Sequence, residues 1–255
     1  MIENNQELRT AVRAARAAGQ EMKKNFGRKY HVIRKDPKEM VTEIDIRSQA
    51  IITEILNGEY GSYGIITEEK RLSTVEEEVN WIIDPIDGTH NFIAGLPFSG
   101  VSIGLVKDGG FYLGVIYFPI EDEMFYAVQG KGAFCNDKPI RVSENGDLSK
   151  AIINYDNQFH KSKKSFDYFK VLTQKAFTVR IFGTATRDLC YTASGHINGR
   201  IWNSTKICDI AAGIVIVTEA GGKVSDFNGK SCTLKSAQVV ASNGKVHDDL
   251  LTILQ

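Results

Sequence analysis

The stretch from Trp81 to Phe92 constrains this chain more than any other part of its sequence. It reads Trp-Ile-Ile-Asp-Pro-Ile-Asp-Gly-Thr-His-Asn-Phe. The apolar run 81–83 contains residues typical of strands and ends abruptly at Asp84, which predicts a buried strand that ends there. Because Pro85 has no N–H and disfavours helical geometry in the residue before it, we expect Asp84 to be extended at the strand terminus.

The second half of this stretch predicts a turn followed by a helix. Asp87 and Gly88 form a common turn pair, glycine allows the backbone to approach a ligand closely, and Thr89 can open a helix. Asp84 and Asp87 therefore lie at the carboxyl end of a strand, in front of a helix N-terminus. Carboxylate oxygens suit hard cations, and helix N-termini suit phosphate. The simpler alternative is a strand, an Asp-Gly turn and a helix cap that bind nothing.

The composition indicates an ordinary soluble globular protein. The chain has 255 residues, 42% of them hydrophobic and 24% charged, enough for one large domain or two small ones. The formal net charge is zero, so no overall field favours nucleic acid or an anionic membrane. The four cysteines form no Cys-x-x-Cys pair, which argues against a zinc site. No signal peptide or membrane-spanning run is visible, so we expect a cytoplasmic protein.

Three further acids occupy positions that are suggestive, although each has a purely structural explanation. Glu68 follows a short predicted strand, where an acid usually lies on the surface. Asp45 follows Thr42 by three residues, a spacing that predicts a helix capping box. Asp209 begins a helix that is apolar on nearly all sides and therefore buried, where it would stabilise the helix dipole.

Taken together, these acids indicate a metal centre. Carboxylates gathered without cations would repel one another and have raised pKa values. Oxygen ligands with open positions for water suit Mg²⁺, and a pair of such ions serves phosphate-ester hydrolysis.

The remaining periodicity predicts alternating helices and strands in two parts, an N-terminal subdomain of residues 1–145 and a C-terminal subdomain of residues 146–255. Leu8 to Phe26 shows helical spacing with Asn4 as its cap, and residues 101–128 suggest an antiparallel meander of three strands. The expected helices are 4–26, 42–57, 165–175, 185–194, 208–220 and 245–254, and the expected strands are 30–33, 65–67, 81–84, 101–106, 111–119, 124–128, 152–155, 178–182, 198–203 and 239–241.

The residues around these acids resemble the inositol monophosphatase family, which shares a lithium-sensitive, Mg²⁺-dependent phosphatase superfamily with fructose-1,6-bisphosphatase. The resemblance rests on Asp84 to Phe92, on Glu68-Glu69, and on Asp209-Ile210-Ala211-Ala212-Gly213 to Gly222, and it extends from about residue 4 to residue 250. It implies an α+β or α/β fold, a layered αβαβα sandwich of the sugar-phosphatase type, and commonly a homodimer.

The same resemblance implies roles for individual residues. Glu68, Asp84 and the Ile86 carbonyl would hold a first Mg²⁺, and Asp84, Asp87 and Asp209 a second. Glu68 would also support a third, weaker site.

Further residues would serve catalysis and the substrate. Thr89 and Asp45 would orient and deprotonate the attacking water, which replaces the capping role of Asp45. The remaining implied contacts to the substrate are Gly88, Thr89, Gly183, Thr184, Ala185 and Lys35.

Two departures from the family pattern concern the substrate. Cys208 stands where the family often has Trp, which we interpret as a change in packing. Members directed at inositol carry an acidic residue about seven positions before the last metal-binding Asp, and here residues 202–204 are Trp-Asn-Ser. This argues against inositol phosphate and leaves fructose 1,6-bisphosphate, histidinol phosphate and NADP open. The basic run 160–164 and Arg187 are candidates for binding a second phosphate.

The leading hypothesis is therefore a Mg²⁺-dependent phosphomonoesterase that hydrolyses a small phosphorylated metabolite, such as an inositol-1-phosphate-like compound or a sugar phosphate, with metal-activated water. The rival from another class is a regulatory binding protein that keeps the fold. A two-metal nuclease is a third possibility, and the lack of a basic groove signature counts against it.

Overall fold

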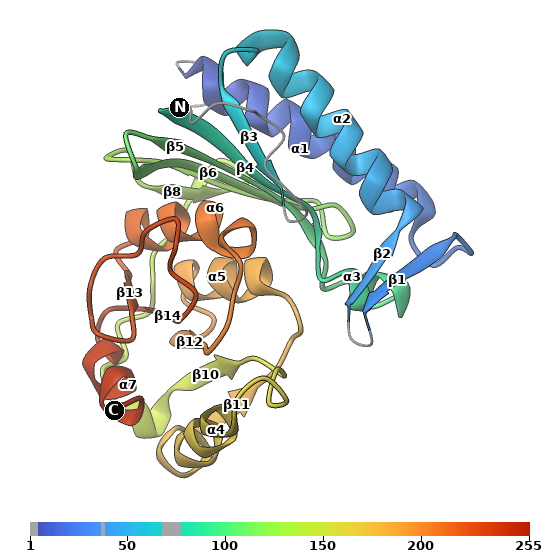
Figure 1. Ribbon diagram of the computed structural model, residues 1–255. Coiled ribbons are helices and arrows are strands. Elements are labelled where there is room, and N and C mark those ends of the chain that lie inside the picture. The colour runs from blue at the N-terminus through green and yellow to red at the C-terminus, as the bar shows by residue number, and fades with distance from the viewer. Residues whose placement is uncertain (1–4, 37–38, 68–77) are drawn as a thin grey trace.

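The computed structural model describes residues 5–36, 39–67 and 78–255, which form five layers (Figure 1). Helices α1 and α2 cover one face of a seven-stranded sheet, α5 and α6 lie between that sheet and a five-stranded sheet, and α4 and α7 cover the far side. The predicted αβαβα sandwich is confirmed. The helices are α1 (Gln6–Asn25), α2 (Glu43–Tyr60), α3 (Thr89–Ile93), α4 (Lys163–Lys175), α5 (Ala185–Ala193), α6 (Ile207–Glu219) and α7 (His247–Ile253), with a 3₁₀-helix η2 (Leu148–Lys150).

The larger sheet contains the predicted meander. Its order is β3-β4-β5-β6-β7-β8-β9, in which β3 and β4 are parallel and every other pair is antiparallel. Strands β8 and β9 were not predicted; they are very short and are joined by Asn136 and Asp137 at positive φ. The strands are β3 (Gly64–Thr67), β4 (Val79–Asp87), β5 (Gly100–Lys107), β6 (Gly110–Phe118), β7 (Glu123–Val128), β8 (Ala133–Cys135) and β9 (Lys138–Pro139).

The smaller sheet is mixed, with the order β11-β10-β12-β14-β13. Strands β11, β10 and β12 are parallel, whereas β14 is antiparallel to both β12 and β13. The division at residues 145/146 stays a prediction, although each of these two sheets lies on one side of it. The strands are β10 (Ile152–Tyr155), β11 (Thr178–Arg180), β12 (Gly199–Trp202), β13 (Lys223–Asp226) and β14 (Val239–Ser242), and a separate hairpin pairs β1 (Val32–Asp36) with β2 (Glu39–Thr42).

Helix α1 packs on the sheet through small side chains. Ala11, Ala14, Ala15 and Ala18 are fully buried, so the helix lies close to its neighbours. The predicted cap, Asn4, lies outside the described residues. Asn5 caps the helix instead, since its side chain accepts a hydrogen bond from the amide of Leu8 at 2.8 Å.

Helix α6 is buried between the two sheets, as its apolar sequence predicts. It lies against β5 and β6 at two glycines. A Cβ on Gly114 would lie 2.1 Å from the carbonyl oxygen of Ala212, and one on Gly104 would lie 3.1 Å from the Ala211 Cβ. This close approach fixes the start of α6, and with it Asp209, relative to the larger sheet.

We therefore expect Gly114→Ala to lower the free energy of unfolding by about 1–3 kcal/mol, because α6 must move to admit the methyl group. The matched control is Gly58→Ala in α2, where a Cβ would meet nothing within 4 Å. That change should leave stability unchanged or raise it by about 0.5–1 kcal/mol. Urea unfolding measures both, and equal stability of the two variants would contradict the close approach.

Strand β4 is longer than the sequence predicted. It continues through Pro85 to Asp87, and its pairing with β5 shifts register between Asp84 and Asp87. A shift of this kind accommodates a proline, which cannot donate to the ladder. The strand end predicted at Asp84 was therefore wrong by three residues.

The helices of the described residues include none that is long and apolar enough to cross a membrane.

Candidate active site

The end of β4 places two carboxylates at the junction of the layers. Asp84 is 4% exposed and Asp87 is 8% exposed. The carboxylate of Asp84 turns back on its own strand, where Oδ1 accepts a hydrogen bond from the amide of Ile86 at 3.1 Å. The two acids are thus held in a fixed geometry by the irregular end of the strand.

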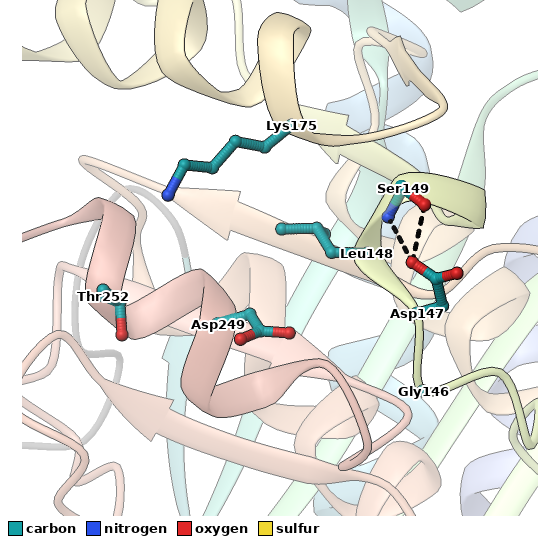
Figure 2. A pocket seen from close by; sticks show the side chains of 7 residues that line it. All are labelled: Gly146, Asp147, Leu148, Ser149, Lys175, Asp249 and Thr252. Carbon is teal, nitrogen blue, oxygen red and sulfur yellow. Dashed lines mark hydrogen bonds between the residues drawn. The ribbon is translucent and has the colours of Figure 1, made fainter.

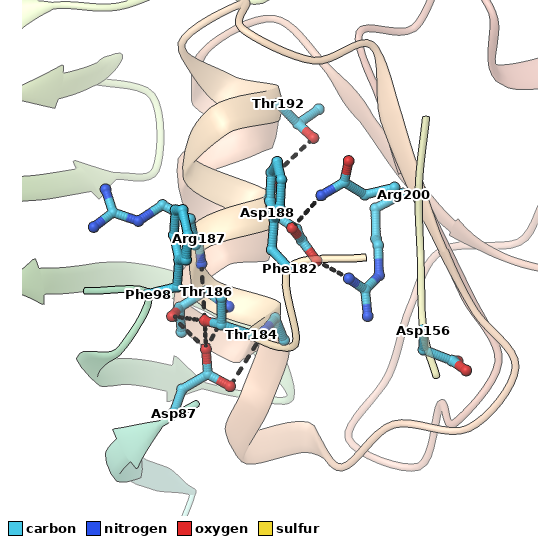
Figure 3. A network of polar contacts seen from close by, with 12 residues as sticks. Asp87, Phe98, Asp156, Phe182, Thr184, Thr186, Arg187, Asp188, Thr192 and Arg200 are labelled. Carbon is cyan, nitrogen blue, oxygen red and sulfur yellow. Dashed lines mark hydrogen bonds and ion pairs between the residues drawn. The ribbon is translucent and has the colours of Figure 1, made fainter. Parts of the chain in front are cut away.

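Asp87 joins the larger sheet to the N-terminus of α5. Its carboxylate accepts hydrogen bonds from the Ala185 amide at 3.2 Å and the Thr186 amide at 2.9 Å, and from the hydroxyls of Thr184 and Thr186 (Figure 3). Thr184 also caps α5, through a contact with the Arg187 amide. The contact of Thr186 with Asp87 was not predicted, because the two residues are 99 positions apart and no local pattern connects them.

Gly88 turns the chain from β4 into α3. Its φ is +80°, and a Cβ there would lie 2.5 Å from the carbonyl oxygen of Phe98. Both the backbone conformation and the lack of space require glycine. Helix α3 begins at Thr89, as predicted.

Asp45 performs the predicted capping role and also contacts Thr89. Its Oδ2 accepts hydrogen bonds from the amide and hydroxyl of Thr42, and the Asp45 and Ile44 amides donate to the Thr42 hydroxyl. Its Oδ1 lies 3.1 Å from the hydroxyl of Thr89, which also lies 2.9 Å from the Ile86 carbonyl oxygen. Burial raises the pKa of the Asp45 carboxyl, and the hydrogen bonds from Thr42 and Thr89 oppose that shift. The capping and active-site interpretations of Asp45 are therefore compatible, because they use different oxygens.

Asp209 lies in the first turn of α6. Its Oδ2 accepts hydrogen bonds from the Lys206 amide at 3.1 Å and the Thr205 hydroxyl at 3.2 Å. The carboxylate thus caps the start of the helix, where the sequence predicted that it would stabilise the helix dipole, and it lines the same cavity as the acids of β4.

A cavity of about 780 Å³ brings together most of the predicted site residues. Asp84, Ile86, Asp87, Gly88, Thr89, Gly183, Thr184, Ala185 and Asp209 all line it. Glu68 and the side chain of Lys35 lie outside the described part of the chain, so their predicted roles stay predictions. The residues that the sequence analysis did not assign to this cavity include Met40, His90, Asn91, Asp156, Asn157, Gln158, Arg200, Ser204, Thr205 and Lys206.

A second cavity, of about 470 Å³, contains none of the predicted residues (Figure 2). It lies among η2, the end of α4 and α7. Its acid Asp147 caps η2, accepting hydrogen bonds from the Ser149 amide at 3.0 Å and the Ser149 hydroxyl at 2.6 Å. Asp147 and Ser149 thus serve local structure.

The donors of the large cavity fit a hard cation. They are carboxylate oxygens and the Ile86 carbonyl, which are the ligands that Mg²⁺ accepts. Asp87 is buried, and all of its hydrogen-bond donors among the described residues are neutral amides and hydroxyls. Within residues 5–36, 39–67 and 78–255, no three carboxylate, His or Cys side chains are close enough together to hold an ion by themselves.

Only some of the residues predicted to bind a second phosphate lie at the cavity. Arg187 is fully buried, with ion pairs to Glu121 at 2.8 Å and Glu123 at 2.6 Å, and its guanidinium lies 3.4 Å from the centre of the Phe118 ring. It faces away from the cavity, so the prediction for Arg187 was wrong. Of the basic run 160–164, His160 and Lys161 line the cavity, whereas Lys163 and Lys164 belong to α4.

Comparison with known proteins gives a consistent result. Residues 3–255 match the model of the inositol monophosphatase family. A Pasteurella multocida protein named Nus factor SuhB is 38% identical, over 98% of this chain and 96% of its own length. A Thermotoga maritima fructose-1,6-bisphosphatase/inositol-1-monophosphatase is 34% identical, over 96% of this chain and 94% of its own. The crystal structure of the extragenic suppressor protein suhB from Bartonella henselae superposes with a TM-score of 0.94 at 32% identity, covering 98% of this chain and 99% of that one.

Proposed function

This chain belongs to the inositol monophosphatase family and is a phosphoric monoester hydrolase, and we propose that it is a Mg²⁺-dependent enzyme acting on a small phosphorylated metabolite. The observation that carries the proposal is the convergence of Asp84, Asp87 and Asp209 with the Ile86 carbonyl on one cavity. These groups come from β4 and α6, which the chain separates by more than a hundred residues.

The proposed metal ligands are Glu68, Asp84 and the Ile86 carbonyl for a first Mg²⁺, and Asp84, Asp87 and Asp209 for a second, with Glu68 supporting a third ion. Bound Mg²⁺ supplies positive charge for the phosphate and lowers the pKa of a water. The hydrogen bonds to Asp84 and Asp87 orient these two carboxylates, and the ions would draw them together with Asp209, since no three such side chains of the described residues are close enough to hold an ion by themselves.

Thr89 and Asp45 are the proposed catalytic pair, with Glu68 alongside them. The Thr89 hydroxyl accepts a hydrogen bond from the attacking water and donates its own proton toward Asp45 Oδ1, 3.1 Å away. Asp45 is thereby placed to receive the proton as the water attacks phosphorus. Since its other oxygen is held by Thr42, the carboxylate keeps this orientation.

The phosphate is proposed to lie on the backbone amides of Gly88 and Thr89. Both residues line the cavity, so a ligand there can approach their backbone. Gly183, Thr184 and Ala185 form the adjoining wall, and Lys35 on the β1–β2 hairpin is proposed to reach the entrance.

We further propose a homodimer inhibited by lithium, as the resemblance implies, and a cytoplasmic location, as the sequence predicts. All four cysteines are free thiols, consistent with a reducing compartment. Inositol-1-phosphate-like compounds and sugar phosphates are the leading substrates, and fructose 1,6-bisphosphate, histidinol phosphate and NADP are the alternatives.

A regulatory binding role is the second candidate. It is favoured by one specific observation, the name Nus factor that the Pasteurella multocida relative carries. Zero net charge argues against strong nucleic-acid binding as part of that role.

Phosphate release from a panel of substrates tests the proposal. The panel contains inositol 1-phosphate, fructose 1,6-bisphosphate, histidinol phosphate and NADP, each assayed in Mg²⁺ and in Mg²⁺ with added lithium. We expect release from at least one compound and a lower rate with lithium. No release from any of them would favour the binding role.

A further inference from the structure

One wall of the large cavity contains a buried arginine that the proposed mechanism does not use. Arg200 lies on β12 and is 4% exposed. Its Nη1 forms an ion pair with the carboxylate of Asp188, and its guanidinium lies 4.8 Å from the centre of the Trp202 ring. Both Arg200 and Trp202 line the cavity.

Asp188 holds this arginine from one side only. Asp188 lies on α5, is fully buried, and also accepts a hydrogen bond from the Asn154 side chain. In Figure 3 the guanidinium lies between Asp188 and Asp156, with its contact directed at Asp188. The guanidinium Nε is buried and has no hydrogen-bond acceptor among the described residues. Trp202 Nε1, which is buried beside it, likewise has no acceptor in that part of the chain.

The neighbouring loop adds further polar side chains beside Arg200. Asp156 is 3% exposed, and its two oxygens accept hydrogen bonds from the amides of Gln158 at 2.8 Å and Asn203 at 3.2 Å. The same loop places His160 and Lys161 on the cavity wall. Burial lowers the pKa of the Arg200 guanidinium to about 10, with Asp156 first among the acids that oppose the shift, so the group is protonated at neutral pH.

We propose that Arg200 binds a second anionic group of the substrate, a phosphate or carboxylate on the part of the molecule that is not hydrolysed. This inference rests on the proposed phosphatase function and names the substrate class. An arginine fixed by a buried carboxylate presents its remaining N–H groups in a set direction, which suits the oxygens of an anion.

Two matched pairs of substrates test the proposal. Fructose 1,6-bisphosphate differs from fructose 1-phosphate by one phosphate, and 3-phosphoglycerate differs from glycerol 3-phosphate by one carboxylate. We expect kcat/KM to be at least about tenfold higher for the doubly anionic member of one pair, the range of a charge-assisted hydrogen bond. Which pair shows the preference identifies the anion as phosphate or carboxylate.

The preference should fall to about onefold in the double variant Arg200→Gln with Asp188→Asn. Removing both charges avoids leaving Asp188 buried and unpaired, which would endanger folding. The matched control is Arg141→Gln, an exposed arginine outside the cavity, which should keep the preference. A purely structural role for Arg200 would instead lower kcat/KM equally for both members of a pair.

Equilibrium binding separates this inference from the proposed function. Calorimetry with the Thr89→Val variant in Mg²⁺ should show the same preference for the doubly anionic compound without turnover, even if no substrate in the panel is hydrolysed. Equal affinity for both members of each pair, or a preference that survives the double variant, would overturn the role of Arg200.

Discussion

Asp84→Asn is expected to lower kcat/KM for phosphomonoester hydrolysis by at least about a hundredfold. Asp84 is the ligand proposed to bridge both ions, and the change removes a negative charge from a residue that is 4% exposed. The amide keeps the size of the side chain, and its oxygen can still accept from the Ile86 amide. The loss should therefore fall on metal binding and rate, while the fold is retained.

The matched control is Asp167→Asn, which removes the same charge from an exposed position on α4. It should retain the parent activity. Calorimetric titration with Mg²⁺ adds a readout besides turnover, and we expect weaker binding only in Asp84→Asn. Parent-like rates and Mg²⁺ affinity in that variant would remove Asp84 from the proposed site.

Thr89→Val is expected to lower kcat by about 10²–10⁴-fold, the contribution typical of a positioned proton-transfer group. Valine matches threonine in shape but cannot join the attacking water to Asp45. Because Thr89 is not a proposed metal ligand, the affinity for Mg²⁺ should stay close to that of the parent.

Thr89→Ser is the matched control, since it keeps the hydroxyl near Asp45 Oδ1 and the Ile86 carbonyl. It should retain most of the activity. Single-turnover phosphate release distinguishes the variants, and equal rates for serine and valine would show that the hydroxyl takes no part in proton transfer.

Much of the fold could be predicted because its signals are local. The apolar helix at residues 208–222 predicted the buried α6, and the hairpin turns predicted the meander of β5, β6 and β7. Short elements such as β8 and β9 escaped prediction, because strands of two or three residues depend on pairing with neighbours rather than on their own pattern.

The acids of the candidate site could be predicted from the sequence. The residues that hydrogen-bond to these acids were harder to predict. Asp84, Asp87 and Asp209 occur in recognisable local contexts, and the family resemblance connected them. Thr186, which fixes Asp87, comes from a helix almost a hundred residues away. No pattern in one chain shows such a contact.

Arg187 and Arg200 also show that the role of a charged residue could not be predicted from the sequence. The charge of Arg187 made it a candidate for binding phosphate. In the fold, however, it forms ion pairs with Glu121 and Glu123. No role was predicted for Arg200, which lies in a strand sequence without a motif. The fold nevertheless places it on the cavity wall. The charge of an arginine is visible in the sequence, but whether it binds a ligand or forms an internal ion pair depends on the residues that pack around it.

The most direct test of the central claim is a Mg²⁺ titration of phosphate release after treatment with EDTA. If the acids of β4 and α6 form a metal-dependent phosphatase site, hydrolysis of the best substrate in the panel should stop in EDTA and return as Mg²⁺ is added. Turnover that continues unchanged in EDTA would contradict the account.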